Sequence, residues 1–146
     1  MRRIDYLVLH CSATREGQEL PPEALERAHR LRGFNGTGYH YYIRRDGTTV
    51  GTRPLKLVGA HVKGYNKYSI GICYEGGLDA QGHACDTRTA QQRTALRALV
   101  ARLLRRFPQA RVCGHRDLSA DLNGNGRVEP HEWLKQCPCF DVATQL

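Results

Sequence analysis

Residues 5–10 have the sequence Asp5-Tyr6-Leu7-Val8-Leu9-His10, an apolar run that ends in a histidine. A run of this length is typical of a buried strand, and His10 would lie at its carboxyl end. The segment Ala110-Arg111-Val112-Cys113-Gly114 is expected to form a last core strand, and it leads into His115. Because ligand sites in sheets of parallel strands lie at the carboxyl ends of the strands, we expect the two histidines to lie side by side.

Strands and helices are interspersed along the rest of the chain. Asp46-Gly47 between two β-type runs predicts a hairpin, and a basic amphipathic pattern later in the chain predicts a helix with a charged outer face. The expected elements are helices at 22–31 and 89–107, a strand at 69–74, hairpin strands within 39–45 and 48–53, and loops at 12–18 and 76–82. This order predicts an α/β fold, with a single domain over residues 1–146 and a central mixed β-sheet flanked by helices.

The charge of the chain indicates an anionic partner. At 146 residues, the formal net charge is +8 and the isoelectric point is near 9.5. Nucleic acid, an anionic membrane and the bacterial cell wall all fit this charge, which does not choose among them. The apolar run before His10 is too short for a signal peptide or a membrane span. We therefore expect synthesis in the cytoplasm without a signal peptide, where the six cysteines stay mostly reduced.

The C-terminal quarter adds a thiol and an ammonium to the two histidines. Cys137 follows Lys135 closely, in the sequence Lys135-Gln136-Cys137-Pro138. Two neutral imidazoles and one thiolate are the ligands of a catalytic zinc ion that keeps a fourth position open. Taken singly, each of His10, His115 and Cys137 is better explained as a core residue than as a ligand. A cysteine hydrolase with a Cys/His pair is the other reading, but it explains neither the separated histidines nor Lys135.

Six short motifs of the chain occur together, in this order, in one known family. They are Val8-Leu9-His10-Cys11-Ser12-Ala13-Thr14, Gly38-Tyr39-His40-Tyr41, Gly59-Ala60-His61-Val62-Lys63-Gly64-Tyr65-Asn66, Ser69-Ile70-Gly71-Ile72-Cys73, Gly114-His115 and Lys135-Gln136-Cys137-Pro138. The chain resembles the zinc-dependent N-acetylmuramoyl-L-alanine amidases of the peptidoglycan recognition protein superfamily, and most closely the small phage-type amidase endolysins. The resemblance extends from residue 4 to residue 140.

The resemblance implies a role for each of six residues. His10, His115 and Cys137 are implied as zinc ligands, Tyr39 and Lys135 as catalytic groups, and His61 as a cleft residue that contacts either the substrate or a metal ligand. Tyr39 would hydrogen-bond the water or the substrate at the zinc, and Lys135 would stabilise the developing oxyanion.

The implied activity is hydrolysis of the amide bond between N-acetylmuramic acid and L-alanine in peptidoglycan. The alternative is a peptidoglycan-binding or regulatory protein of the same fold without turnover. We expect peptidoglycan as the partner, no nucleic acid, no membrane insertion and a monomeric protein. It would act on the cell wall after release or export, as a phage or prophage lysis protein does.

The segment between His115 and Lys135 departs from the phage-type pattern. Residues 121–132 match the EF-hand calcium loop, with Asp121, Asn123, Asn125, Arg127 and Glu132 as candidate calcium ligands. Two asparagines replace acidic ligands, and the preceding segment is not a helix. A structural calcium site and a simple Asn-Gly turn are therefore both open readings.

The other cysteines have structural readings. Cys11 is expected to face away from His10, because successive side chains of a strand point to opposite faces. Cys139 lies two residues after Cys137, so an extended segment would place both thiols on one side. Cys139 is accordingly either a second thiolate near the metal or a small buried residue.

Overall fold

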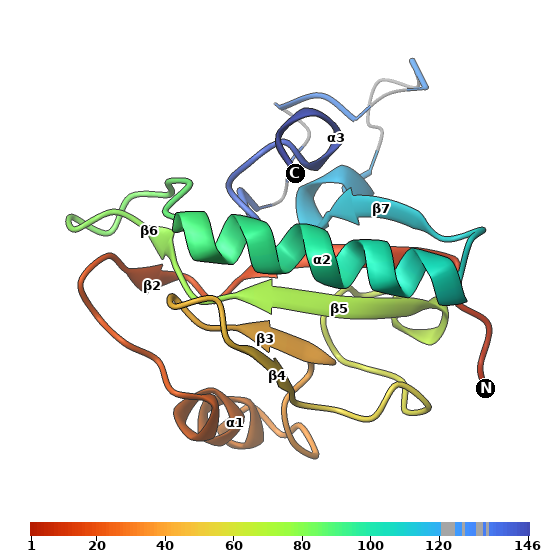
Figure 1. The fold of residues 1–146 in the computed structure, drawn as a ribbon, viewed down its shortest axis with the longest axis horizontal. Helices are drawn as coiled ribbons and strands as arrows, with labels where there is room; N and C mark the ends of the chain where they lie inside the picture. Colours follow the sequence, from red (N-terminus) through yellow and green to blue (C-terminus); the bar gives the residue numbers. More distant parts are fainter. Residues whose placement is uncertain (121–124, 127, 131–132, 134) are drawn as a thin grey trace.

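The computed structural model describes residues 1–120, 125–126, 128–130, 133 and 135–146, and its centre is a five-stranded sheet (Figure 1). The strands are β1 (Tyr6–Cys11), β3 (Tyr41–Ile43), β4 (Thr49–Gly51), β5 (Ser69–Tyr74) and β7 (Arg111–Gly114), in the order β4-β3-β5-β1-β7. β4 pairs antiparallel with β3, whereas β3, β5, β1 and β7 are mutually parallel. The predicted mixed sheet and hairpin are confirmed.

Helices cover both faces of this sheet. α2 (Ala90–Arg106) begins with a capping box in which Thr89 and Gln92 bond each other's backbone N–H groups, and in Figure 1 it runs along the central strands on one face of the sheet. Its apolar face packs on alternate strand residues such as Leu9 and Ile72. α1 (Pro22–Leu31) packs Leu25 against Tyr42 on the opposite face. The alternation of side chains along the strands therefore builds two separate apolar layers.

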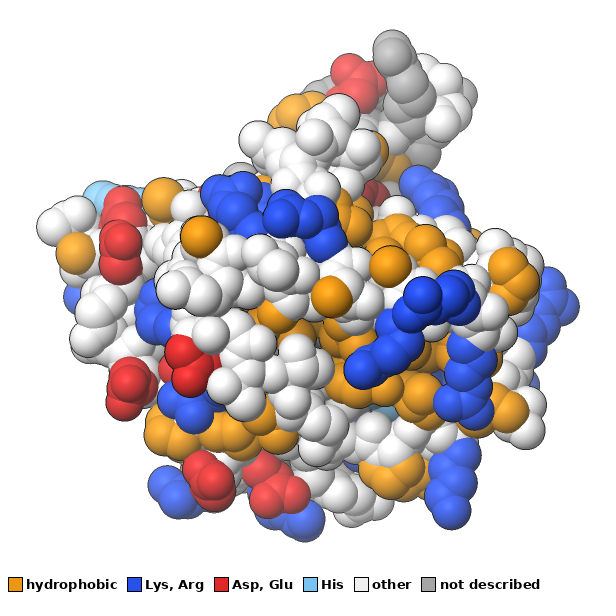
Figure 2. All heavy atoms as spheres, viewed as in Figure 1, with side chains coloured by type: hydrophobic (Ala, Val, Ile, Leu, Met, Phe, Trp, Pro, Cys, Tyr) orange, Lys and Arg blue, Asp and Glu red, His pale blue; other side chains and the backbone are white. Residues whose placement is uncertain are grey.

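The outer face of α2 is basic, as its sequence predicts. Arg97, Arg102, Arg105 and Arg106 are exposed on this helix. Figure 2, drawn from the same side, shows Lys and Arg side chains gathered over this face of the molecule. Among the described residues, no helix combines the length and the apolarity that crossing a bilayer needs.

Several short elements were not predicted. β2 (Thr14–Arg15) and β6 (Gly77–Leu78) form a two-stranded parallel sheet where the sequence predicts loops. In the part of the chain that the structure describes, the 3-10 helices η1 (Asn66–Tyr68) and η2 (His115–Leu118) and the helix α3 (Val142–Gln145) are also additional. Elements of two to four residues are too short to show a periodic pattern, so the prediction of loops at 12–18 and 76–82 was wrong only where β2 and β6 pair.

The C-terminal segment returns to the carboxyl end of the central strands. The Tyr74 hydroxyl donates to the Pro138 carbonyl oxygen at 2.7 Å, and the Arg116 N–H donates to the Cys137 carbonyl oxygen at 2.9 Å. Phe140 is buried in the main core, where the guanidinium carbon of Arg88 lies 3.3 Å from its ring centre. These contacts hold the segment that carries Cys137 beside β1 and β7.

Candidate metal centre

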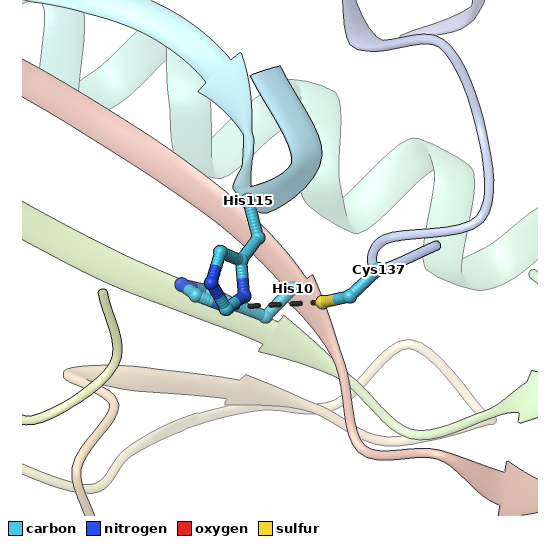
Figure 3. Close-up of side chains that lie close together, drawn as sticks. All are labelled: His10, His115 and Cys137. Carbon is cyan, nitrogen blue, oxygen red and sulfur yellow. Dashed lines mark hydrogen bonds between the residues drawn. The ribbon is translucent and has the colours of Figure 1, made fainter. Parts of the chain in front are cut away.

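Three side chains with metal-binding atoms meet at the carboxyl ends of β1 and β7 (Figure 3). β1 carries His10, η2 begins at His115 directly after β7, and Cys137 comes from the returning C-terminal segment. One ligand atom from each residue lies within 4.8 Å of the other two. The expectation that parallel strands place the two histidines side by side agrees with their ring centres, which are 4.8 Å apart.

His10 is oriented by a second histidine. Its Nε2 lies 2.9 Å from Nδ1 of His61, and Nε2 of His61 lies 3.1 Å from the Ser69 hydroxyl. This row of hydrogen bonds is satisfied when His10 carries its proton on Nε2, which leaves the lone pair of Nδ1 for a metal. Nδ1 of His10 is the nitrogen that faces Cys137, at 3.8 Å from its Sγ. His61 thus contacts a candidate ligand and also lines the cleft.

The loop before η1 holds His61 in place. The backbone N–H groups of His61 and Val62 both donate to the side-chain oxygen of Asn66, each at 2.8 Å. The His61 ring packs directly on the backbone of Gly71 in β5, where an added Cβ would lie 2.7 Å from Cγ of the ring. The sequence analysis missed Asn66, Ser69 and Gly71 as supports of the site, although each lies inside a quoted motif.

Gly71→Ala is expected to displace His61 and to weaken metal binding at His10. Overpacking of this kind lowers the free energy of unfolding by about 1–3 kcal/mol. The matched control is Gly51→Ala, because no atom lies within 4 Å of a Cβ added at Gly51. Urea unfolding and a zinc titration measure both effects. Equal stability and zinc affinity in the two variants would contradict the packing argument.

The imidazoles of the cluster are held neutral. Burial, followed by the charges of His61, His115 and Lys135, keeps the pKa of His10 well below its usual value. Burial and then Lys135 lower the pKa of His115. Burial also lowers the pKa of His61 to about 3. Neutral imidazoles are the form that binds metals, so the site needs no deprotonation of its histidines at neutral pH.

The stability of the metal-free protein is expected to fall with pH below about 6.5. The pKa of His40 is lowered to about 4 and that of His61 to about 3, chiefly by burial, so the unfolded chain binds these protons more readily than the folded protein does. Each histidine then contributes a stability that is complete above its unfolded pKa and is lost toward its folded pKa, by up to about 1.4 kcal/mol per pH unit.

Urea unfolding of chelator-treated protein at about pH 7, 5.5 and 4.5 measures this dependence. His83→Gln is the control, because the His83 side chain is 78% exposed and lies outside the buried histidines. A free energy of unfolding that stays constant from pH 7 to 4.5 would show that these histidines protonate without cost in the folded state.

A cleft opens in front of the three candidate ligands. Its volume is about 910 Å³, and His61, Tyr39 and Lys135 line it together with His115 and Cys137. The ring centres of Tyr39 and His10 lie 5.0 Å apart. Burial raises the pKa of Tyr39 well above its usual value, so the phenol keeps its proton and can donate a hydrogen bond. Lys135 is exposed at the rim of the cleft.

Cys139 does not join the ligand cluster. It lies at a bend and has a φ of 71°, so the alternation expected of an extended segment does not apply. Among the described residues, the ligand cluster consists of His10, His115 and Cys137, and the alternative of Cys139 as a second thiolate near the metal does not hold. Its Sγ lies 3.9 Å from Sγ of Cys11, which faces away from His10 into the core under α2. The Cys11 backbone N–H donates to Sγ of Cys137 at 3.2 Å, a contact that sequence reasoning missed.

Most of the candidate calcium loop lies outside the described residues. Asp121, Asn123, Arg127 and Glu132 belong to the part of the chain that is not described. Asn125 is exposed, and its side-chain amide donates to the Glu129 carboxylate. The calcium loop therefore stays a prediction.

Comparison with known proteins agrees with the sequence and the site. A family model described as N-acetylmuramoyl-L-alanine amidase matches residues 1–133. The endolysin of Escherichia phage T7 is 34% identical over 138 residues, covering 94% of this chain and 82% of the endolysin. The endolysin of Enterobacteria phage K11 is 36% identical over 134 residues, covering 92% and 80%.

Solved structures show the same architecture. N-acetylmuramoyl-L-alanine amidase LysC from Clostridium intestinale URNW superposes with a TM-score of 0.74 at 29% identity, covering 94% of this chain and 77% of LysC. Drosophila PGRP-LB superposes with a TM-score of 0.70 at 23% identity, covering 94% and 76%, which supports the fold alone. The predicted resemblance and fold class are confirmed, and this chain belongs to the N-acetylmuramoyl-L-alanine amidase family.

Proposed function

We propose that this enzyme hydrolyses the amide bond between the lactyl group of N-acetylmuramic acid and L-alanine in peptidoglycan, using one zinc ion held by His10, His115 and Cys137. The proposal rests on one observation: a ligand atom from each of the three residues lies within 4.8 Å of the other two, beside a cleft. Two neutral imidazoles and a thiolate are a donor set that suits tetrahedral zinc. When bound there, zinc supplies Lewis-acid polarisation of a carbonyl group and a more acidic water.

The residues around the ligands have separate tasks. His61 fixes the ring of His10 through the 2.9 Å hydrogen bond between Nε2 and Nδ1. Tyr39 stays protonated and can donate its hydroxyl proton to a water or to the substrate beside His10. Lys135 brings a positive charge to the cleft, where the scissile carbonyl oxygen becomes negative during attack.

The charge of the cleft supports peptidoglycan as the substrate. Among the described residues that line it, Arg32, Lys63, Arg116 and Lys135 are cationic and none is acidic. The stem peptides of peptidoglycan carry free carboxylates, so the potential of the cleft complements them. Among this chain's relatives are phage endolysins, and we extend their role to this chain as lysis of the wall after release or export.

The test is the release of free L-alanine amino termini from purified peptidoglycan. Zinc-loaded protein should release them, chelator-treated protein should not, and added zinc should restore the reaction. If zinc-loaded protein releases none but sediments with the wall, the non-catalytic peptidoglycan-binding function replaces the enzymatic one. The same preparation, run by size-exclusion chromatography, tests the proposed monomer.

The calcium loop is tested separately. Calorimetry at millimolar calcium should show binding if residues 121–132 form an EF-hand-like site. No heat of binding at that concentration would favour the Asn-Gly turn.

A further inference from the structure

Two thiols from opposite ends of the chain lie next to each other beside the metal centre. Sγ of Cys11 and Sγ of Cys139 are 3.9 Å apart, although 128 positions separate the two residues in the sequence. Cys11 directly follows His10, and Cys139 lies two residues after Cys137. A bond between the two thiols would therefore tie together the segments that supply two of the three candidate ligands.

Gly77 leaves room for the two thiols. The backbone of Gly77 in β6 packs against Cys11, and a Cβ at Gly77 would lie 2.5 Å from the Cys11 Sγ. The Cys139 thiol donates to the Gly77 carbonyl oxygen at 3.4 Å. Because Gly77 has no side chain of its own, it adds no atom between the two sulfurs. Both residues are among those that line the 910 Å³ cleft, although Cys11 is buried and Cys139 is half-buried.

We propose that Cys11 and Cys139 are a redox pair that forms a disulfide bond once the protein leaves a reducing compartment. The proposal rests on the proposed action at the cell wall, because that substrate lies outside the reducing interior of the cell. A disulfide has a sulfur–sulfur distance of about 2.05 Å, so the two Sγ atoms must approach each other by about 1.9 Å. Cys137 keeps its place as a ligand, held by the N–H of Cys11 at 3.2 Å.

The oxidant is a small-molecule disulfide of the glutathione class. The hydrogen bond to Cys137 and burial raise the pKa of Cys11 to about 12, and contact with Cys11 and burial raise the pKa of Cys139, so both thiols keep their protons at neutral pH and exchange is slow. Once one of them loses its proton, that thiolate attacks a sulfur of the oxidant, so a mixed disulfide forms and one thiol leaves. The second cysteine then attacks the protein sulfur of that mixed disulfide and expels the second thiol. In total, the protein thiols lose two electrons and two protons, and one disulfide molecule is reduced to two thiols.

The disulfide bond would stabilise the protein and keep the segments of the metal centre together. It closes a loop that contains nearly the whole chain, which restricts the unfolded state most strongly when the loop is long. It also restrains the C-terminal turn against β1, so His10 and Cys137 cannot separate by fraying of the chain end. We expect the oxidised protein to melt roughly 5–15 °C above the reduced protein.

The bond is tested by peptide mapping of the zinc-loaded full chain. The protein is equilibrated in glutathione buffer poised near about −200 mV, its remaining thiols are alkylated, and it is digested with trypsin. The proposal predicts a reducible link between the tryptic peptides 4–15 and 136–146, which contain Cys11 and Cys139. Because peptide 136–146 also contains Cys137, the digestion is repeated with two variants. The link should disappear in Cys139→Ser. It should survive in Cys137→Ser, which is mapped without zinc because it is expected to lose the metal, beside wild-type protein that has been treated with a chelator.

Three results of the peptide mapping would overturn the proposal. They are the absence of a link in the wild type, a link that persists in Cys139→Ser, and a link that runs to Cys85. Cys85→Ser, which removes an exposed thiol, is the matched control.

The melting temperature gives a second test: it should rise on oxidation of the wild type and stay constant in Cys139→Ser. The oxidised protein should retain its zinc, measured with a chromogenic chelator after unfolding. Loss of zinc on oxidation would contradict the claim that the disulfide bond stabilises the metal centre. None of these readouts depends on hydrolysis, so failure of the amidase test would be recognised separately.

Discussion

Cys137→Ser is expected to abolish metal binding and hydrolysis together, lowering kcat/KM by at least about 10³-fold, or roughly 4 kcal/mol of transition-state stabilisation. Cys137 is the anionic member of the candidate ligand set, and a serine hydroxyl ionises far less readily than a thiol. The remaining imidazoles of His10 and His115 bind a divalent ion much more weakly than the complete set of three. The loss should appear first in the zinc content of the purified protein.

The control for this substitution is Cys85→Ser, which removes an exposed thiol of the same chemistry. Zinc content and the release of L-alanine amino termini are measured on both variants, and circular dichroism confirms that both are folded. Cys137→Ser that holds one equivalent of zinc and keeps more than a tenth of the wild-type activity would remove Cys137 from the ligand set.

Lys135→Ala is expected to lower kcat by about 10²–10³-fold while the zinc content stays at one equivalent. The ammonium group lines the cleft and lies close enough to His10 and His115 to lower the pKa of both. It is therefore placed to stabilise negative charge on a carbonyl oxygen bound in front of these ligands. Since that charge develops only during the reaction, KM should change much less than kcat.

Lys67→Ala is the matched control, because Lys67 is an exposed lysine on η1 that stacks over Tyr68. Lys135→Arg, which keeps the charge but changes its shape, should fall between the wild type and Lys135→Ala. Steady-state kinetics on a soluble muropeptide separates kcat from KM. If Lys135→Ala loses less than threefold in kcat, another group stabilises the oxyanion.

The longer elements of the fold could be predicted because their patterns are strong. β1 comes from a continuous apolar run, β5 and β7 come from short segments rich in Ile, Val and Cys, and α2 comes from an apolar stripe that repeats at helical spacing. β2 and β6 could not be predicted in this way. Their pairing depends on where the loops after β1 and β5 meet in space, which two residues of sequence do not encode.

The candidate site was predictable to different degrees. The neighbouring positions of His10 and His115 follow from two parallel strands that end at one edge of the sheet. No such geometric argument applies to Cys137, because its segment is irregular. The thiol that it adds to the two imidazoles, its position near Lys135 and the family resemblance indicated it instead. For Cys139 the reading as a small residue packed on the core agrees with the structure, whereas the alternative of a second thiolate near the metal assumed an extended segment, and its positive φ excludes that.

The order of the ligands along the chain has a consequence for synthesis. Of the three candidate ligands, His10 is translated first, His115 second and Cys137 last. A nascent chain therefore carries an incomplete ligand set until residue 137 has been added. If the proposed site is correct, we expect the product of a premature stop or a frameshift before codon 137 to be inert toward the wall of the cell that makes it.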